Sequence, residues 1–157
     1  MFSTIRTIRL IAALPLLCCA LFIFSAVRLS AQAPATLTQS ASTLSVRVTG
    51  IRNANGKIRI ALFRDSKWVE NREVEIDSNT LTAQTVFVNL PRGVYSVNVF
   101  HDENMNGKMD TNLFGMPVEG YGFSNNPAKR MGKPGFDETS FPLNQPEAAI
   151  EIKMIYW

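Results

Sequence analysis

The sequence predicts an all-β protein, an antiparallel β-sandwich of about seven strands with one long ordered loop. Apolar and polar residues alternate in several short runs after residue 43, which is the period of half-buried strands. These runs recur at intervals of roughly 8 to 15 residues and are separated by Gly, Pro, Asn and Asp. No window after the N-terminal segment keeps a helical period over three turns.

Residues 1–31 have the composition of a secretory signal peptide. Arg6 and Arg9 precede the uncharged apolar run 10–27, and small residues then lead to Ala31. This order predicts export, with cleavage after Ala31. An uncleaved N-terminal anchor is the alternative, because 18 apolar residues are just long enough to cross a bilayer. We therefore expect a periplasmic or secreted protein that meets the membrane only through this segment, and only if it is uncleaved.

Removal of this segment would change both charge and cysteine content. Three of the 16 basic residues and none of the 13 acidic residues lie before residue 34, so the mature chain is formally neutral. A neutral chain does not favour nucleic acid as a partner. Cys18 and Cys19 both lie in the apolar run, so we expect no disulfide in the exported domain.

The remaining chain divides into a flexible linker over 32–42, rich in Ala, Thr, Ser and Gln, and a sandwich domain over 43–157. Strands are expected at 44–48 and 58–62, joined as a hairpin by turn residues 53–56. Residues 65–79 fit either a short helical turn or an edge strand. Further strands are expected at 81–90, 93–100, 139–143 and 149–156. The side chains expected to face inward are Leu44, Val46, Val48, Ile58, Ile60, Leu62, Val86, Val88, Tyr95, Val97, Val99, Ile150, Ile152 and Met154.

Residues 101–135 lose the strand pattern and are expected to form one long loop. Long loops in compact domains are usually functional or disordered. The aromatic residues of this loop argue against disorder, so we expect it to fold back onto the sandwich. Lys129, Arg130 and Lys133 form a small basic cluster, which we interpret as a solvated loop face.

Several motifs in and around this loop are similar to those of a known family. They are GVY at 93–95, HDENMNGKMD at 101–110, GMPVEGYGFSNN at 115–126 and PGF at 134–136. Together they resemble the exported bacterial proteins called domain of unknown function 2141, over roughly residues 44–156. The resemblance implies a periplasmic or secreted sandwich of transthyretin or immunoglobulin-like type, with no established activity.

Residues 102–110 have the spacing of a calcium-binding loop. Short oxygen donors stand at positions 1, 3, 5 and 9 of such a loop, namely Asp102, Asn104, Asn106 and Asp110. Gly107 follows at position 6, where the chain must turn, and the Lys108 carbonyl and a water would bring the ligands to about six. The glutamate of position 12 is replaced by Leu113, so Ca²⁺ binding would be weak. The alternative is a polar turn whose side chains bond their own backbone.

A ligand pocket near the same loop is the second candidate site, formed by His101, Glu119, Tyr121 and Asn125. No serine stands in a nucleophile elbow, and one histidine is too few for most zinc sites. We therefore expect a non-catalytic module that binds an envelope protein or glycan. A structural domain without ligand is the next interpretation, and an enzyme that uses His101 and Glu119 as an acid and base is the last.

Overall fold

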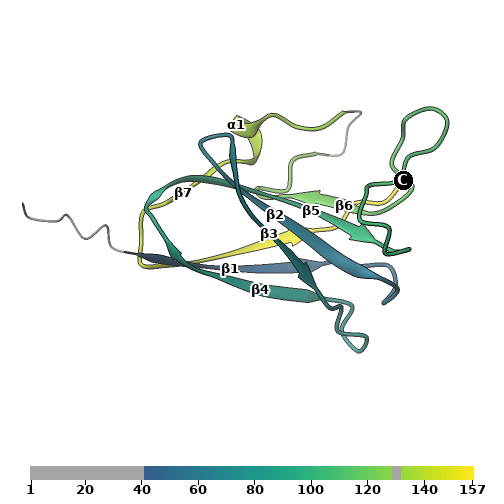
Figure 1. The fold of residues 1–157 in the computed structure, drawn as a ribbon, viewed down its shortest axis with the longest axis horizontal. Helices are drawn as coiled ribbons and strands as arrows, with labels where there is room; N and C mark the ends of the chain where they lie inside the picture. Colours follow the sequence, from purple (N-terminus) through teal and green to yellow (C-terminus); the bar gives the residue numbers. More distant parts are fainter. Residues whose placement is uncertain (1–40, 129–131) are drawn as a thin grey trace, which may run out of the picture. The chain divides into compact units, whose positions relative to one another are not determined.

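The computed structural model describes residues 41–128 and 132–157, so the predicted signal segment and most of the linker lie outside the described residues. The elements are β1 (Ser42–Thr49), β2 (Lys57–Arg64), β3 (Lys67–Val74), β4 (Ala83–Leu90), β5 (Gly93–Asp102), β6 (Tyr121–Phe123), α1 (Phe136–Thr139), β7 (Phe141–Leu143) and β8 (Glu147–Lys153). One sheet has the order β4–β1–β8, and the other has the order β3–β2–β5–β6 with β7 also on β5. Figure 1 shows the sheets as two layers, which confirms the predicted all-β sandwich.

Pairing in both sheets is antiparallel except between β1 and β8. These two strands run parallel, with Val46 opposite Ile150 and Val48 opposite Ile152. The first and last described strands therefore lie side by side in the sheet, and the ends of the domain are held together by backbone hydrogen bonds.

The first two strands do not form the predicted hairpin, because β1 and β2 belong to different sheets. Residues 50–56 carry the chain across, and the same Asn and Gly residues that suit a tight turn also suit this crossing. The tight hairpin joins β2 to β3 instead, through Asp65 and Ser66 with φ of 49° and 64°. Positive φ at both central residues defines a type I′ turn. Residues 65–79 thus contain the edge strand β3.

The core lies between the two sheets and contains most of the predicted inward row. Val86 and Val88 were placed there wrongly, because they are 39% and 55% exposed, whereas Phe87 is fully buried. Burying the larger Phe87 side chain removes more apolar area from water. Asn89, with φ of 59°, lies where the β1–β4 register shifts, and the shift turns Leu90 inward as well. The buried apolar residues are Leu44, Val46, Val48, Ile51, Ile58, Ile60, Leu62, Ala83, Phe87, Leu90, Tyr95, Val97, Val99, Leu143, Ile152 and Met154, with Ile150 packed at their edge.

Tyr95 fixes the connection that crosses from β4 to β5. Its ring is fully buried, and its hydroxyl donates a 2.6 Å hydrogen bond to the carbonyl of Pro91, four residues earlier. Burial raises the pKa of the Tyr95 phenol, so the hydroxyl keeps the proton that it donates. This arrangement is the tyrosine corner found in immunoglobulin-type sandwiches.

The predicted loop 101–135 folds back onto the second sheet, and β6 interrupts it. β6 pairs with β5 and places Tyr121 opposite Phe100. Two backbone bonds continue the attachment, from His101 N to the Gly120 carbonyl at 2.8 Å and from Ser124 N to the Val97 carbonyl at 2.9 Å. The loop is therefore docked along β5, the strand on which the candidate site is built.

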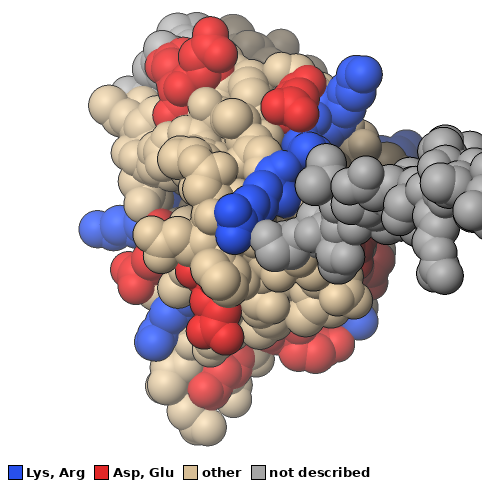
Figure 2. Space-filling model, turned by 90° about the vertical axis from the view of Figure 1, so that its left-hand side faces the viewer, with Lys and Arg blue, Asp and Glu red and all other residues tan. Residues whose placement is uncertain are grey.

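Charged side chains are spread over the surface. Figure 2 shows one face, on which acidic and basic residues are interspersed among uncharged ones. Within residues 41–128 and 132–157, no helix combines the length and the hydropathy needed to cross a membrane.

Candidate functional site

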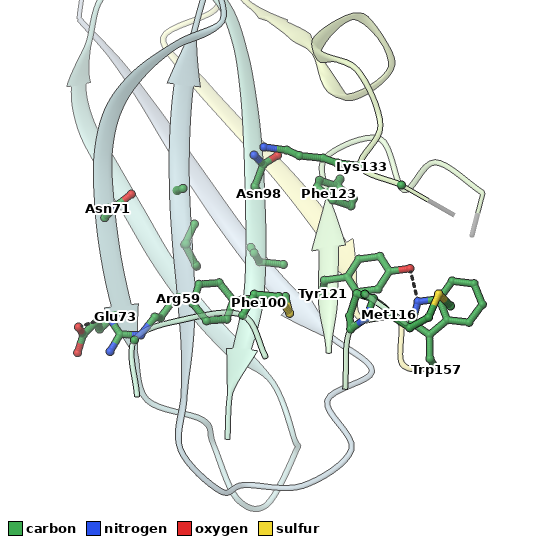
Figure 3. Close-up of a pocket in the computed structure, with 18 of the residues that line it drawn as sticks. Arg59, Asn71, Glu73, Asn98, Phe100, Met116, Tyr121, Phe123, Lys133 and Trp157 are labelled. Carbon is green, nitrogen blue, oxygen red and sulfur yellow. Dashed lines mark hydrogen bonds and ion pairs between the residues drawn. The ribbon is translucent and has the colours of Figure 1, made fainter. Parts of the chain in front are cut away.

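A cavity of about 710 Å³ lies on the outer face of the second sheet (Figure 3). Its floor consists of two cross-strand rows that the strand registers place next to each other. One row is Glu73–Arg59–Phe100–Tyr121, and the other is Asn71–Ala61–Asn98–Phe123. These residues alternate along their strands with inward-facing ones, so the strands that build the core also build the floor.

The walls come from the long loop and from the C-terminal residue. Met109, Phe114 and Met116 line the cavity from the loop, and Trp157 lines it from the chain end. Trp157 Nε1 donates a 2.9 Å hydrogen bond to the hydroxyl of Tyr121, which ties the chain end to the floor. Aromatic and thioether side chains offer the adaptable apolar surface that suits small organic ligands.

The loop tip at the rim is held by its own hydrogen bonds. The Asn112 side-chain oxygen accepts from the backbone N–H of Phe114 at 2.9 Å and of Met116 at 3.0 Å. The tip thereby presents Leu113 and Phe114 to solvent, with 102% and 88% of their surface exposed.

Arg59 carries the main charged contacts of the cavity floor. Its Nε donates to the Asp102 carboxylate at 2.5 Å, and its Nη1 donates to Glu73 at 2.6 Å. The guanidinium is thus shared between two carboxylates, and this part of the cavity holds no excess of positive charge.

Asn98 and Lys133 lie together at another part of the cavity, as Figure 3 shows. The Lys133 Nζ lies 5.4 Å from the centre of the Phe63 ring, within the range of a cation–π contact. Among the described residues, the Asn98 carboxamide has no hydrogen-bond partner and the Lys133 ammonium has no acidic partner. These two groups are therefore available to a ligand.

The calcium-type loop brings three of its predicted side chains together. The Asn104 Nδ2 donates to Asp110 at 2.6 Å, and the Asn106 Nδ2 donates to the same carboxylate at 3.0 and 3.1 Å. Lys108, predicted to offer its carbonyl, donates its N–H to the Asn106 side chain at 2.8 Å. Across the described part of the chain, no three His, Cys, Asp or Glu side chains are grouped closely enough to hold a metal ion.

Asp102, the first residue of this loop, is fully buried. Its carboxylate accepts from the N–H of Asn106 at 3.0 Å and of Gly107 at 2.9 Å, in addition to Arg59. Burial is the largest single influence on the Asp102 pKa and acts to raise it, but the hydrogen bonds from Arg59, Gly107 and Asn106 outweigh burial and lower the pKa. The carboxylate stays charged, and a calcium ion would compete with Arg59 for it.

Glu119 closes the loop rather than facing the cavity. Its Oε1 accepts from the Glu103 N–H and its Oε2 from the Asp110 N–H, both at 3.0 Å. One buried carboxylate therefore holds both ends of the loop, with each oxygen already bonded.

His101 points into the sandwich, where it is fully buried. Its Nε2 lies 2.6 Å from the Asn55 carbonyl, which can only accept, so Nε2 carries the proton in the neutral ring. Nδ1 then accepts from the Tyr156 hydroxyl at 2.9 Å. Burial raises the pKa of Tyr156, which keeps that hydroxyl protonated as the donor. The histidine is a bonded core residue.

Asn125 belongs to a short segment that ties separate elements together. Its Nδ2 donates to the Ser140 carbonyl at 2.7 Å, while Ser124 Oγ accepts from Val97 N at 2.9 Å and donates to the Thr139 carbonyl at 2.5 Å. Of the four residues predicted to form a pocket, only Tyr121 lines the cavity. The other three, His101, Glu119 and Asn125, are bonded elsewhere.

The structure therefore defines a two-sheet β-sandwich with a ligand-sized hollow on one outer face. The chain matches the family described as "Uncharacterized protein conserved in bacteria (DUF2141)" over residues 46–151, and it belongs to that family. This match confirms the resemblance found in the loop motifs. No curated protein and no solved structure shows significant similarity to the chain.

Most of the cavity was not predicted from the sequence. Phe100 and Tyr121 meet only because β6 adds to the sheet, and β6 was not expected. Lys133 was interpreted as part of a solvated cluster, whose other members, Lys129 and Arg130, lie outside the described residues. The available signal was Phe100, an aromatic residue on the outward side of a strand that otherwise alternates regularly.

Proposed function

We propose that the protein is an exported, non-catalytic binding module whose ligand occupies the cavity on the outer face of the second sheet. The cavity itself carries this proposal. Its volume of about 710 Å³ lies within the range of small-molecule sites. Its lining also follows their pattern of apolar walls with a few polar groups. The order of Arg6, Arg9, apolar run and Ala31 supports export to the periplasm or medium.

A binding role is favoured over catalysis by the positions of His101 and Glu119. Both histidine nitrogens and both glutamate oxygens already have partners within the fold. An acid–base pair must reach the proton that it transfers, and neither side chain lines the cavity. The ligand is a component of the cell envelope or medium, free or as part of an envelope protein or glycan, whose apolar body fits between the walls.

Weak calcium binding by the 102–110 loop is a second, accessory role. It is favoured by the spacing of Asp102, Asn104, Asn106 and Asp110, and the ion would have to replace the amide N–H donors that bond the Asp110 carboxylate. The fit is incomplete, because Asp102 is bonded to Arg59, and the expected Kd is about 10⁻⁴ to 10⁻³ M. A bound ion would stiffen the loop that carries Met109 into the cavity wall.

Blocking the cavity tests the binding role. Ala61 lies in the middle of the floor, and Ala149 is exposed on the other sheet. N-phenyl-1-naphthylamine, a neutral dye that brightens in apolar surroundings, should bind the wild-type protein and Ala149→Trp equally. Ala61→Trp should weaken dye binding about tenfold or more, which is about 1.4 kcal/mol.

Two results would contradict the proposal. One is the absence of dye binding to the wild-type protein, and the other is equal binding by Ala61→Trp, which would place the dye elsewhere. Near-ultraviolet circular dichroism of both Trp variants checks that tertiary packing is retained, because dyes of this kind also bind loosened states.

A further inference from the structure

We propose that the cavity selects amphipathic organic anions, with a flat apolar body and one carboxylate or sulfonate. This inference rests on the proposed binding function and names the ligand class of that site. The anionic group lies against Lys133 and Asn98, and the apolar body lies against Phe100, Tyr121 and Met116.

The charges of the lining point to an anion. Three cationic side chains line the cavity, namely Arg59, Arg72 and Lys133. Arg59 is shared by two carboxylates, and Arg72 donates to Glu70 at 2.8 Å. Among the described residues, only Lys133 lines the cavity without an acidic partner. Lys133 is an exposed residue at the cavity, so its ammonium supplies the countercharge from a partly solvated position.

Asn98 supplies the second recognition element. Its half-buried carboxamide stands in the floor between Ala61 and Phe123, with no partner among the described residues. The amide NH₂ can donate to a carboxylate or sulfonate oxygen, while Lys133 supplies the countercharge. Asn98 is only half-buried, so its carboxamide can bond water when no ligand is bound, and a ligand oxygen can take the place of that water.

The other side of the cavity sets the orientation of the ligand. Glu73 stands at the end of the row that contains Phe100 and Tyr121, and its negative charge disfavours an anionic group there. The apolar surface of Phe100, Tyr121, Met116 and Trp157 lies along that row (Figure 3). The ligand's body is therefore directed toward this row and its charge toward Lys133.

Two dyes that differ by one sulfonate separate this inference from the binding proposal. 8-Anilinonaphthalene-1-sulfonate has the aromatic body of N-phenyl-1-naphthylamine plus the anionic group. Lys133→Gln should weaken binding of the sulfonate by about tenfold and change binding of the neutral dye by less than about twofold. Lys133→Arg should keep the wild-type affinity for the sulfonate dye, because it keeps the positive charge. Lys153→Gln, at an exposed lysine of β8, is the control and should bind both dyes as the wild type does.

The substitution Asn98→Asp and added salt are two further tests of anion binding. Asn98→Asp should weaken sulfonate binding about tenfold without weakening the neutral dye, because it places a negative charge beside Lys133. Added NaCl should weaken binding of the sulfonate dye and leave binding of the neutral dye unchanged. 1-Naphthoate should displace the sulfonate at about tenfold lower concentration than 1-naphthalenemethanol, which extends the result to carboxylates.

The outcomes are distinguishable. If the neutral dye binds and Lys133→Gln leaves the sulfonate affinity unchanged, the anion inference is wrong and the binding module remains. If neither dye binds the wild-type protein, both proposals are wrong.

Discussion

The Nε of Arg59 donates a 2.5 Å hydrogen bond to the buried carboxylate of Asp102, which lies 43 positions later in the chain. This contact joins β2 to the last residue of β5, where the 102–110 loop begins. The same guanidinium reaches Glu73 on β3 and lines the cavity. One side chain therefore connects the edge strand, the cavity floor and the base of the 102–110 loop, and several properties of the protein depend on it.

The charge of Asp102 should make stability depend on pH. The pKa of Asp102 is lowered in the folded state, so the charged carboxylate contributes to the free energy of unfolding. This contribution is complete above the unfolded pKa of about 3.9 and is lost as the pH falls through the lower folded pKa. Asp102→Asn should reduce the free energy of unfolding at pH 7 by about 2 kcal/mol. Urea unfolding between about pH 3 and pH 7 should show the difference from wild type shrinking at the acidic end. Asp137→Asn, at an exposed aspartate of α1, should change stability by less than about 0.5 kcal/mol, and an equal loss in both variants would contradict the assignment.

Calcium should raise the melting temperature if the 102–110 loop binds it. At a hundredfold excess over Kd, the ion stabilises the folded protein by about 2.7 kcal/mol, a rise of several degrees for a domain of this size. Asp102→Ala should abolish the rise, Asn98→Ala should retain it, and magnesium should substitute poorly. If about 10 mM calcium leaves the wild-type melt unchanged while Asp102→Ala still lowers it, the loop is a self-bonded polar turn.

Loss of the Tyr95 hydroxyl should destabilise the sandwich. Tyr95→Phe leaves the Pro91 carbonyl without its donor at the crossing between the sheets, and we expect a loss of about 1 to 2 kcal/mol in urea unfolding. Tyr121→Phe removes a hydroxyl that is bonded at the surface to Trp157, and it should change stability by less than about 0.5 kcal/mol. Similar losses in the two variants would show that the hydrogen bond from Tyr95 to the Pro91 carbonyl stabilises the fold no more than a surface hydrogen bond does.

Gly120 and Gly122 should tolerate no side chain. A Cβ at Gly120 would overlap the Tyr156 ring, and a Cβ at Gly122 would lie 2.7 Å from the Ile152 side chain. Each change to Ala should cost about 3 kcal/mol through overpacking, measured as a lower urea midpoint. At Gly135 the nearest atom to a new Cβ is the Glu138 Oε1 at 3.6 Å, so Gly135→Ala should be nearly neutral. A neutral Gly120→Ala would mean that Gly120 is not packed against Tyr156, and a neutral Gly122→Ala would mean that β6 is not packed against Ile152 of β8.

Export should remove the N-terminal segment. The order of Arg6, Arg9, apolar run and Ala31 predicts that intact mass spectrometry of the periplasmic or secreted protein finds a chain beginning at Gln32. A chain beginning at Pro34 would mean that cleavage follows Ala33 instead of Ala31. Recovery of the full-length mass from the membrane fraction would show an anchor instead.

The sandwich and most of its core could be predicted because strand periodicity has a local cause. Leu44, Val46 and Val48 face inward as expected, since alternate side chains of a strand point to opposite faces. The pairing of strands is not local, and residues 50–56 contain turn residues whether they close a hairpin or cross between sheets. The phase of β4 depends on the irregularity at Asn89, which the sequence does not mark.

The candidate site could be predicted only where its residues are close in the chain. Residues 102–110 were predicted as a calcium-type loop with a polar turn as the alternative, and the structure contains side chains of this segment bonded to its own backbone. The partner of Asp102 is distant in sequence, and so are the residues opposite Phe100 and Asn98 in the cavity floor. Their proximity follows from the order of β3, β2, β5 and β6, which no single segment encodes.

The Asn126 side chain covers part of one edge of the first sheet. Its Nδ2 donates to the Glu151 carbonyl at 2.9 Å, and its Oδ1 accepts from the Lys153 N–H at 2.8 Å. β8 is an edge strand, and the free backbone groups of such an edge are a template on which another chain can add. The Asn126 side chain forms two of the hydrogen bonds that a neighbouring strand would otherwise form with β8. The backbone groups of Glu151 and Lys153 are thereby closed to a strand of a second copy.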